Sequence, residues 1–224
     1  MELTILMPCL NEEKTILICI NKALEFLEKN NINGEVLIAD NGSTDKSIEI
    51  IKNTKARIII VKEKGYGSAL INGIKESKGK YIIMGDCDDS YDFTNLMPFL
   101  ENLRNGYDLV MGNRYLGGIE KGAMSISHKI GVKGLTWLGN IIYKTKLGDY
   151  HCGLRGFNKE KIMDLSLCHL GMDFASEIIL KSAKKGYKII EIPTTLKKDG
   201  RNRPSHLRTI SDGILHVKCL LKYR

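Results

Sequence analysis

Short apolar runs alternate with longer amphipathic segments through the first half of the chain. The runs predict strands at residues 2–8, 35–39, 57–61 and 81–84. Between them, apolar residues at helical spacing predict helices at 12–29, 43–53 and 66–77. Ser43 or Thr44 is the expected cap of the second helix. Such alternation is typical of a parallel sheet with helices on both faces.

The second half of the chain is less regular. Predicted helices cover 96–104, 126–143, 172–185 and 207–222, and predicted strands cover 108–111 and 188–192. The glycine-rich segment 112–122 is an expected loop, and 149–157 is expected to hold a loop and a short strand. No repeat or linker divides the 224 residues. We therefore expect a single α/β domain with a Rossmann-like, mostly parallel sheet flanked by helices.

Three polar segments, 8–12, 40–45 and 85–92, directly follow predicted strands. The carboxyl ends of parallel strands meet at one edge of a sheet, and ligands bind at that edge near the point where the strand order reverses. We expect the three segments to gather there and form one binding site.

The third of these segments contains the carboxylate pair of Asp86-Cys87-Asp88. Two carboxylates at positions i and i+2, on a loop that leaves a buried strand, can reach one hard divalent cation. Mg²⁺ and Mn²⁺ prefer oxygen ligands and keep coordination places for phosphate oxygens. An ordinary acidic turn is the alternative interpretation, because a short motif of this kind also occurs by chance.

The formal net charge of +8 indicates a surface that attracts phosphates, whether of nucleotides, nucleic acids or lipids. Lysines spread along the whole chain also fit a merely solvated surface. Gly65-Tyr66-Gly67 starts a dinucleotide fingerprint, but Leu70 stands where its last glycine is required. No recognisable nucleic-acid module is present, so we expect no nucleic-acid partner.

The chain shows no targeting or membrane-spanning signal. No stretch reaches the ~18 to 20 apolar residues that a transmembrane helix needs, and the N-terminus lacks the basic region of a signal peptide. The six cysteines form no CxxC pair, so we expect reduced thiols in a cytoplasmic protein. His151-Cys152 and Cys168-His169 offer zinc-ligand types, but adjacent side chains rarely point at one metal, and the spacing predicts no zinc site.

Several motifs resemble those of family 2 glycosyltransferases of the GT-A fold. The matching stretches of the first half are 7–13 (MPCLNEE), 39–45 (ADNGSTD), Lys64-Gly65 and 85–88 (GDCD). The second half is similar to the polyprenyl-phosphate (dolichol-phosphate) mannose and glucose synthases. Its matching stretches are 111–115 (MGNRY), 149–157 (DYHCGLRGF) and 171–177 (GMDFASE). The resemblance implies a nucleotide-sugar half over 1–115 and an acceptor half over 116–224.

The resemblance also implies roles for individual residues. The nucleotide-sugar, a UDP- or GDP-hexose, would contact Pro8, Leu10, Glu12, Asp40, Asn41, Lys64, Gly65, Asp86 and Cys87. Asp86 and Asp88 would bind the metal, Mg²⁺ or Mn²⁺. Asp88, Arg114 and Asp173 are the catalytic candidates. Many relatives have a second aspartate in place of Asn41, so the identity of the base stays open.

The basic loop 197–208 is the second departure from the family pattern. Relatives carry an arginine and a Ser-Lys pair where this chain has Arg201, Arg203, His206 and Arg208. Arginine side chains suit phosphate oxygens, so these four residues are expected to clamp the diphosphate, the acceptor phosphate or both. A solvated loop is the alternative interpretation.

The expected acceptor is a polyprenyl phosphate, which is already anionic and needs no strong base. Catalysis would then be mainly electrostatic, and the resemblance implies inversion at the sugar carbon. Asp173 and Glu177 lie four residues apart on one predicted helix face. Asp173 could position the sugar or act as a base toward a hydroxyl acceptor, whereas Glu177 is slightly better explained by helix solubility.

Membrane contact is the remaining question. Segment 126–143 and the terminal helix have apolar faces, the latter through Leu207, Ile210, Ile214, Val217 and Leu221. Such stripes fit either a peripheral contact at the inner face of the membrane or burial in the core. Two further hypotheses remain: transfer to a soluble or protein-bound hydroxyl, and a nucleotide-sugar-binding subunit that requires a membrane partner subunit.

Overall fold

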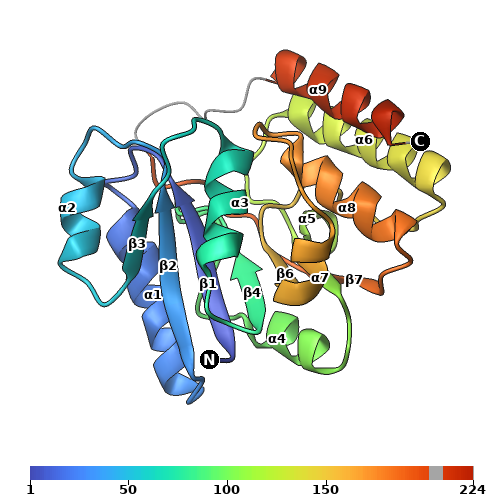
Figure 1. Cartoon of the computed structure of the whole chain (residues 1–224). Coiled ribbons are helices and arrows are strands. Elements are labelled where there is room, and N and C mark those ends of the chain that lie inside the picture. The colour runs from blue at the N-terminus through green and yellow to red at the C-terminus, as the bar shows by residue number, and fades with distance from the viewer. Residues whose placement is uncertain (202–208, 224) are drawn as a thin grey trace.

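The computed structural model describes residues 1–201 and 209–223, and within these residues seven strands form one sheet (Figure 1). The strands are β1 (Leu3–Cys9), β2 (Gly34–Asp40), β3 (Arg57–Ile60), β4 (Tyr81–Met84), β5 (Leu109–Asn113), β6 (Arg155–Asn158) and β7 (Ile189–Pro193). The helices are α1 (Ile16–Lys29), α2 (Ser47–Lys52), α3 (Tyr66–Glu76), α4 (Met97–Arg104), α5 (Arg114–Gly117), α6 (Ile126–Tyr143), α7 (Lys159–Asp164), α8 (Phe174–Lys184) and α9 (Thr209–Lys222).

The strands lie in the order β3-β2-β1-β4-β6-β5-β7. Every pairing is parallel except the two made by β6, which runs antiparallel to both β4 and β5. The prediction of a mostly parallel α/β sheet is therefore confirmed. Because β6 is reversed, Arg155 at its first position pairs with Met84 at the last position of β4. The segment before β6 thus arrives at the edge where β4 ends.

Successive residues of the buried strands point alternately to the two faces of the sheet, and an apolar core lies on each face. On β1, Leu3, Ile5 and Met7 pack on one side of the sheet, in a core shared with α1, α2 and α4. Leu6 points to the other side and packs in a core shared with α3, α7 and α8. Burial on both faces is the reason that the parallel strands read as continuous apolar runs in the sequence.

Some predicted helix boundaries were wrong, because polar side chains expected to cap a helix form hydrogen bonds elsewhere. The second helix begins at Ser47, not after a cap at Ser43 or Thr44. Ser43 Oγ instead accepts the backbone N–H of Asn11, which ties two loops together. The expected loop 112–122 contains α5, whose first turn is capped by the Asn113 side chain. The short helix α7 was not predicted.

Helices α6 and α9 lie side by side at one end of the molecule (Figure 1). Each helix packs one side on the core and leaves part of its predicted apolar stripe exposed, whereas Leu207 and the side chain of Ile210 lie outside the described residues. Ile126, Ile130, Trp137 and Ile141 on α6, and Ile214, Val217 and Leu221 on α9, are exposed. Across residues 1–201 and 209–223, none of the helices has the length and apolar character needed to cross a bilayer. Arg203, His206 and Arg208 of the predicted basic loop lie outside the described residues.

Candidate active site

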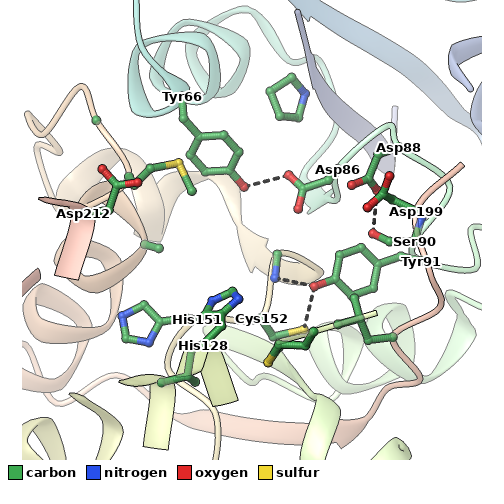
Figure 2. Close-up of a pocket in the computed structure, with 18 of the residues that line it drawn as sticks. Tyr66, Asp86, Asp88, Ser90, Tyr91, His128, His151, Cys152, Asp199 and Asp212 are labelled. Carbon is green, nitrogen blue, oxygen red and sulfur yellow. Dashed lines mark hydrogen bonds between the residues drawn. The ribbon is translucent and has the colours of Figure 1, made fainter. Parts of the chain in front are cut away.

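A cavity of about 1100 Å³ opens at the carboxyl ends of β1 and β4, where the strand order reverses (Figure 2). Asp86 and Asp88 lie on one side of it, and His128 and His151 lie on the other. The cavity is lined by most of the residues that the sequence singled out: Pro8, Leu10, Glu12, Asn41, Lys64, Gly65, Asp86, Cys87, Asp88, Arg114 and Arg201. The three polar segments therefore do converge on one edge.

Hydrogen bonds between the loops fix this edge. Asn11 adopts a left-handed backbone conformation, with φ of 57°, and its side-chain oxygen accepts the backbone N–H groups of Thr44 and Asp45. The Cys87 thiol donates to the carbonyl of Pro8 over 3.0 Å. Each strand end is thus braced by its neighbour, so the site has a preformed shape.

Asp40 is fully buried beside the cavity rather than on its surface. Its Oδ2 accepts the backbone N–H groups of Gly42 and Ser43. Its Oδ1 has no hydrogen-bond partner among the described residues. A buried carboxylate oxygen without a donor is costly.

Asn41 braces the site internally. Its Nδ2 donates to the carbonyls of Val61 and Glu63, and its Oδ1 accepts the N–H of Gly65. Both amide hydrogens are therefore used by the protein itself. The Lys64 ammonium donates to the Asn41 carbonyl over 2.8 Å, which places a cation in the cavity wall.

Asp86 carries an unbalanced negative charge. Burial, followed by the neighbouring Asp88 carboxylate, raises the pKa of Asp86 to about 6. The Tyr66 hydroxyl donates to Asp86 Oδ1 over 3.0 Å, and a side chain at Gly153 would collide with Oδ2. The loop before β6 therefore approaches this carboxylate closely, and glycine is required for that approach.

Asp88 is held by two kinds of donor. Its Oδ1 accepts the hydroxyl of Ser90 at 2.5 Å and the Ser90 backbone N–H at 3.0 Å. Its Oδ2 lies 2.5 Å from Nη2 of Arg201, and Nη1 of the same guanidinium reaches Glu12 Oε1 at 3.2 Å. Arg201, the one member of the predicted basic cluster within the described residues, thus lies over the carboxylates.

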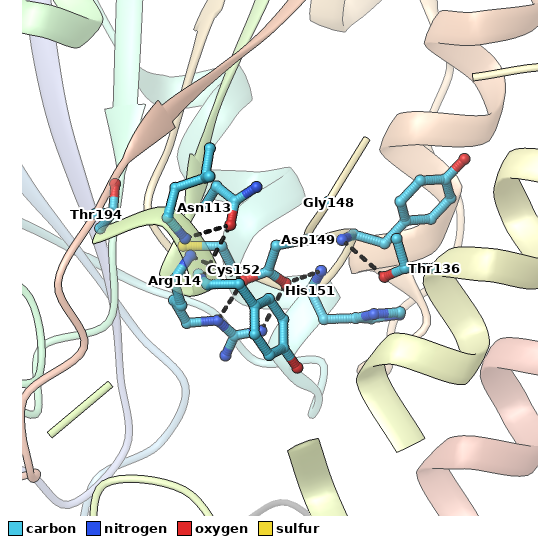
Figure 3. Close-up of polar contacts among 12 residues, drawn as sticks. Asn113, Arg114, Thr136, Gly148, Asp149, His151, Cys152 and Thr194 are labelled. Carbon is cyan, nitrogen blue, oxygen red and sulfur yellow. Dashed lines mark hydrogen bonds and ion pairs between the residues drawn. The ribbon is translucent and has the colours of Figure 1, made fainter. Parts of the chain in front are cut away.

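Arg114 begins α5 and is almost completely buried (Figure 3). Its Nε and Nη2 donate to the two oxygens of Asp149 at 2.6 and 2.8 Å, a bidentate pair. Asp149 also accepts the backbone N–H groups of Arg114 and His151. The pair anchors the loop before β6 to the end of β5, so Arg114 faces the cavity from a fixed position.

Asp173 is a predicted catalytic residue that the structure does not bring to the cavity wall. Its carboxylate is bonded to His169 Nδ1. The interpretation of Glu177 as a solubilising residue was wrong, because Glu177 is fully buried. It accepts the backbone N–H groups of Cys168 and His169, which holds the segment before α8 in place.

Sequence reasoning missed several residues of the cavity wall. The Tyr91 hydroxyl accepts the backbone N–H of Gly153. The Ser176 hydroxyl lies within hydrogen-bond distance of both His151 and His216, and it thereby links the loop before β6 to α9. Burial lowers the pKa of His216 to about 4, and burial also lowers that of His151. His151 lies within a stretch that carries the resemblance, but nothing in the sequence pairs it with a residue of the terminal helix.

Asp86 and Asp88 thus lie in one cavity with Arg114 and Arg201, at the switch point of an α/β sheet. Residues 4–166 match glycosyl transferase family 2. The chain belongs to this family. The fold agrees: glucosyl-3-phosphoglycerate synthase of Mycobacterium tuberculosis, solved with Mn²⁺, UDP-glucose and phosphoglyceric acid, superimposes with a TM-score of 0.77. The alignment covers 99% of this chain and 79% of that one, at 18% identity.

Two curated relatives come from Haloferax volcanii. Low-salt glycan biosynthesis hexosyltransferase Agl6 is 37% identical over 98% of this chain and 53% of its own length. The chain thus spans about half the length of that relative. Dolichyl-phosphate hexose transferase is 26% identical over 86% of this chain and 81% of its own length.

Proposed function

We propose that the chain transfers a hexose from a nucleoside-diphosphate sugar to a polyprenyl phosphate. One observation carries the proposal: a single cavity joins the carboxylates Asp86 and Asp88 to a chamber beside α6 and α9, where apolar side chains alternate with polar ones such as His128 and Asp212. Charged and apolar parts in one continuous site suit a reaction between a sugar nucleotide and a lipid phosphate.

The donor would occupy the end formed by the first half of the chain. Pro8 and Leu10 provide apolar walls for the base, beside Asn41 and the buried Asp40. Lys64 and Arg201 supply positive charge for the diphosphate. The M. tuberculosis structure, which was solved with UDP-glucose, supports a nucleotide-sugar here, although both UDP and GDP fit the groups described.

A divalent cation fits the residues present. Burial, followed by the neighbouring Asp88 carboxylate, raises the pKa of Asp86, and such paired oxygen ligands suit Mg²⁺ or Mn²⁺. Asp86 and Asp88 would hold the ion, which when bound would neutralise charge on the diphosphate leaving group. Mn²⁺ in the M. tuberculosis structure supports this assignment.

The residues of the chain itself would orient and neutralise the reactants. Arg201 would bind the departing diphosphate, and Arg114 would hold the acceptor phosphate close to the anomeric carbon. An acceptor phosphate oxygen would attack the sugar from the side opposite the leaving group, which inverts the configuration. No strong general base is required, and Asp173 is not among the residues that line the cavity.

The acceptor chain would lie in the chamber beside α6 and α9. Met124, Val132, Leu135, Met172 and Leu215 line it, and Leu215 is also partly exposed at the surface. These apolar walls suit the first isoprene units of a polyprenyl chain, and His128 and Asp212 in the same part of the cavity provide polar groups beside them. The relative named dolichyl-phosphate hexose transferase supports an acceptor of this class.

The exposed face of α6 and α9 would rest on an anionic membrane surface. We call it the α6–α9 surface; it consists of Ile126, Ile130, Trp137, Ile141, Ile214, Val217 and Leu221. Lys133 and Lys218 share these helix faces by spacing. Apolar residues interleaved with lysines suit a lipid interface with negative head groups, and peripheral contact there would bring the chamber next to its lipid.

The decisive experiment supplies the purified chain with Mn²⁺, radiolabelled UDP- or GDP-hexoses and either a short polyprenyl phosphate or the corresponding polyprenol. We expect label in the lipid product only with the phosphate. Transfer to the polyprenol or to a soluble hydroxyl compound would replace the proposed acceptor. Nucleotide-sugar binding without turnover on any acceptor would instead favour a binding subunit.

A further inference from the structure

A group of metal-ligating side chains lies outside the active-site cavity, at the N-terminal part of α8 and the end of α9. It consists of Cys168, His169 and Glu177, whose ligand atoms all lie within 4.8 Å of one another. The Cys168 thiol is 3.3 Å from Glu177 Oε1. The three residues converge because the segment before α8 folds back over the first turns of that helix.

The hydroxyl of Tyr223 stands between these three ligand atoms. It lies 3.0 Å from Glu177 Oε1, 3.1 Å from His169 Nε2 and 3.6 Å from Cys168 Sγ. One polar atom thus touches a sulfur, an imidazole nitrogen and a carboxylate oxygen together. An ion held by the three ligand atoms would displace this hydroxyl outward to a fourth coordination place, and each ligand atom would move inward by about 1 Å to reach a metal–ligand bond.

His169 is already oriented as metal-ligating histidines are. Its Nδ1 is bonded to the Asp173 carboxylate, which leaves Nε2 directed at the cluster. A carboxylate behind the imidazole fixes the ring and raises its basicity, and such partners accompany most histidine ligands. Asp173, which is not among the residues that line the cavity, would thus orient His169.

Glu177 is available as an anionic ligand despite being buried. Its carboxylate accepts the backbone N–H groups of Cys168 and His169, and such donors favour the anionic form. Lys181 lies 2.7 Å from Glu177 Oε1. With a thiolate at Cys168, the cluster would carry three negative charges, from Cys168, Glu177 and Asp173. The Lys181 ammonium and a divalent cation would supply three positive charges, so the charges would balance.

We propose that Cys168, His169 and Glu177 form a binding site for Zn²⁺, separate from the carboxylate pair of the active site. A ligand set of thiolate, imidazole and carboxylate matches zinc, whereas Mg²⁺ and Mn²⁺ select oxygen ligands. The fourth position would be taken by water or by the Tyr223 oxygen.

The site would fasten the wall of the nucleotide-sugar cavity. The carbonyl of Leu170, two residues after Cys168, accepts the backbone N–H of Ser68 in the first turn of α3. A bound ion would link the segment 166–171, α8 and the end of α9 in one cluster. Its role is therefore structural, and it requires no part of the proposed sugar transfer.

Metal binding is tested in the full chain carrying Asp86→Asn and Asp88→Asn, which removes the oxygen-ligand pair. We expect this protein to bind one equivalent of Zn²⁺ by elemental analysis and one of Co²⁺, with a thiolate-to-cobalt charge-transfer band that Zn²⁺ abolishes. Cys168→Ser should remove the band and weaken zinc binding at least ~10-fold, and Asp173→Asn should weaken it about 10-fold.

Cys219→Ser is the matched control, because Cys219 is a buried thiol on α9 near the cluster whose hydrogen bond goes to the backbone oxygen of Asp173. It should keep the cobalt band. Circular dichroism without metal establishes that each variant is folded. Absence of a bound equivalent, or a band that persists in folded Cys168→Ser, would overturn the site. Neither result depends on glycosyl transfer, so this proposal and the proposed function can fail separately.

Discussion

Arg201 Nη2 lies 2.5 Å from Asp88 Oδ2, so a cation supplied by the chain already neutralises the second carboxylate of the pair. The same guanidinium contacts Glu12. A divalent ion at Asp86 and Asp88 would compete with Arg201 for Asp88. Loading of the site would therefore release Arg201 toward the phosphates of the donor.

Arg201→Gln should separate these two roles. In the absence of nucleotide it should bind Mn²⁺ more tightly, because its competitor for Asp88 is gone. Turnover should fall on the order of 10²-fold, as is usual when a donor to a developing charge is removed. Calorimetry measures the first effect and product formation the second. Arg104→Gln, which removes an exposed pair with Glu2, is the control and should change neither.

The pKa of Asp86 predicts a pH dependence for metal binding. The folded-state value of about 6 lies above the ordinary value of 3.8. Protons compete with the metal below about pH 6, so Mn²⁺ affinity should rise with pH and level off above that value. A titration by electron paramagnetic resonance across this range measures it. A flat profile would contradict the assignment of Asp86 as a ligand.

The raised pKa of Asp86 also predicts how the stability difference between the wild type and Asp86→Asn depends on pH in the absence of metal. A group with a raised folded-state pKa stabilises the fold at low pH, and this contribution is lost as pH rises through the folded-state value. The wild type should therefore lose stability relative to Asp86→Asn between about pH 4 and about pH 6. Urea denaturation in EDTA at several pH values tests this, and no change in the difference would contradict it.

Asp149→Asn should be severely destabilising. It removes the charge that compensates buried Arg114, and breaking a buried ion pair in this way costs about 3 to 5 kcal/mol. Urea denaturation measures the loss. The surface pair of Arg104 and Glu2 provides the comparison, since Glu2→Gln should cost about 1 kcal/mol or less. Similar losses at the two sites would show that Arg114 finds another partner.

Asn41→Asp should not act as a simple switch of base preference. The Nδ2 group donates to two carbonyls, and a carboxylate would face those oxygens instead. We expect a loss of about 1 to 3 kcal/mol in stability and weaker binding of both UDP and GDP. Thermal shift assays with each nucleotide measure the effect. A selective gain for one base at unchanged stability would refute this explanation.

Trp137→Glu combined with Ile141→Glu should reduce flotation with anionic liposomes. The two side chains belong to the α6–α9 surface, and charges there oppose insertion between head groups. Ile60→Glu is the control, because Ile60 is also exposed but lies on β3, away from these helices. Equal loss in both proteins would indicate general solubility rather than a membrane contact.

The sequence was most informative where a local pattern determines the result. Buried parallel strands appear as apolar runs, so the α/β class was predicted. Asp86 and Glu12 follow such strands, so their convergence could be expected from topology alone. The direction of β6 could not be predicted, because four residues of strand carry no periodicity that distinguishes parallel from antiparallel pairing.

Partners far apart in the sequence were beyond prediction. Arg114 was proposed from the resemblance, but its pairing with Asp149 joins residues on separate elements. Adjacent Cys168 and His169 were poor zinc candidates by spacing alone. Only the reversal of the chain before α8 brings Glu177 between them, and no sequence pattern encodes that path.

Because β6 is reversed, the segment that precedes it forms a part of the cavity wall that is separate from the loops after the parallel strands. This segment enters the sheet at the edge of the cavity, while the loops proposed to bind the donor leave the sheet there from β1, β2 and β4. An evolving or engineered chain could therefore vary residues 144–154 separately from those loops, provided that Asp149 and Gly153, which fix the segment beside Arg114 and Asp86, are kept. With these two residues kept, grafting the segment between relatives would show whether it takes part in choosing the proposed acceptor.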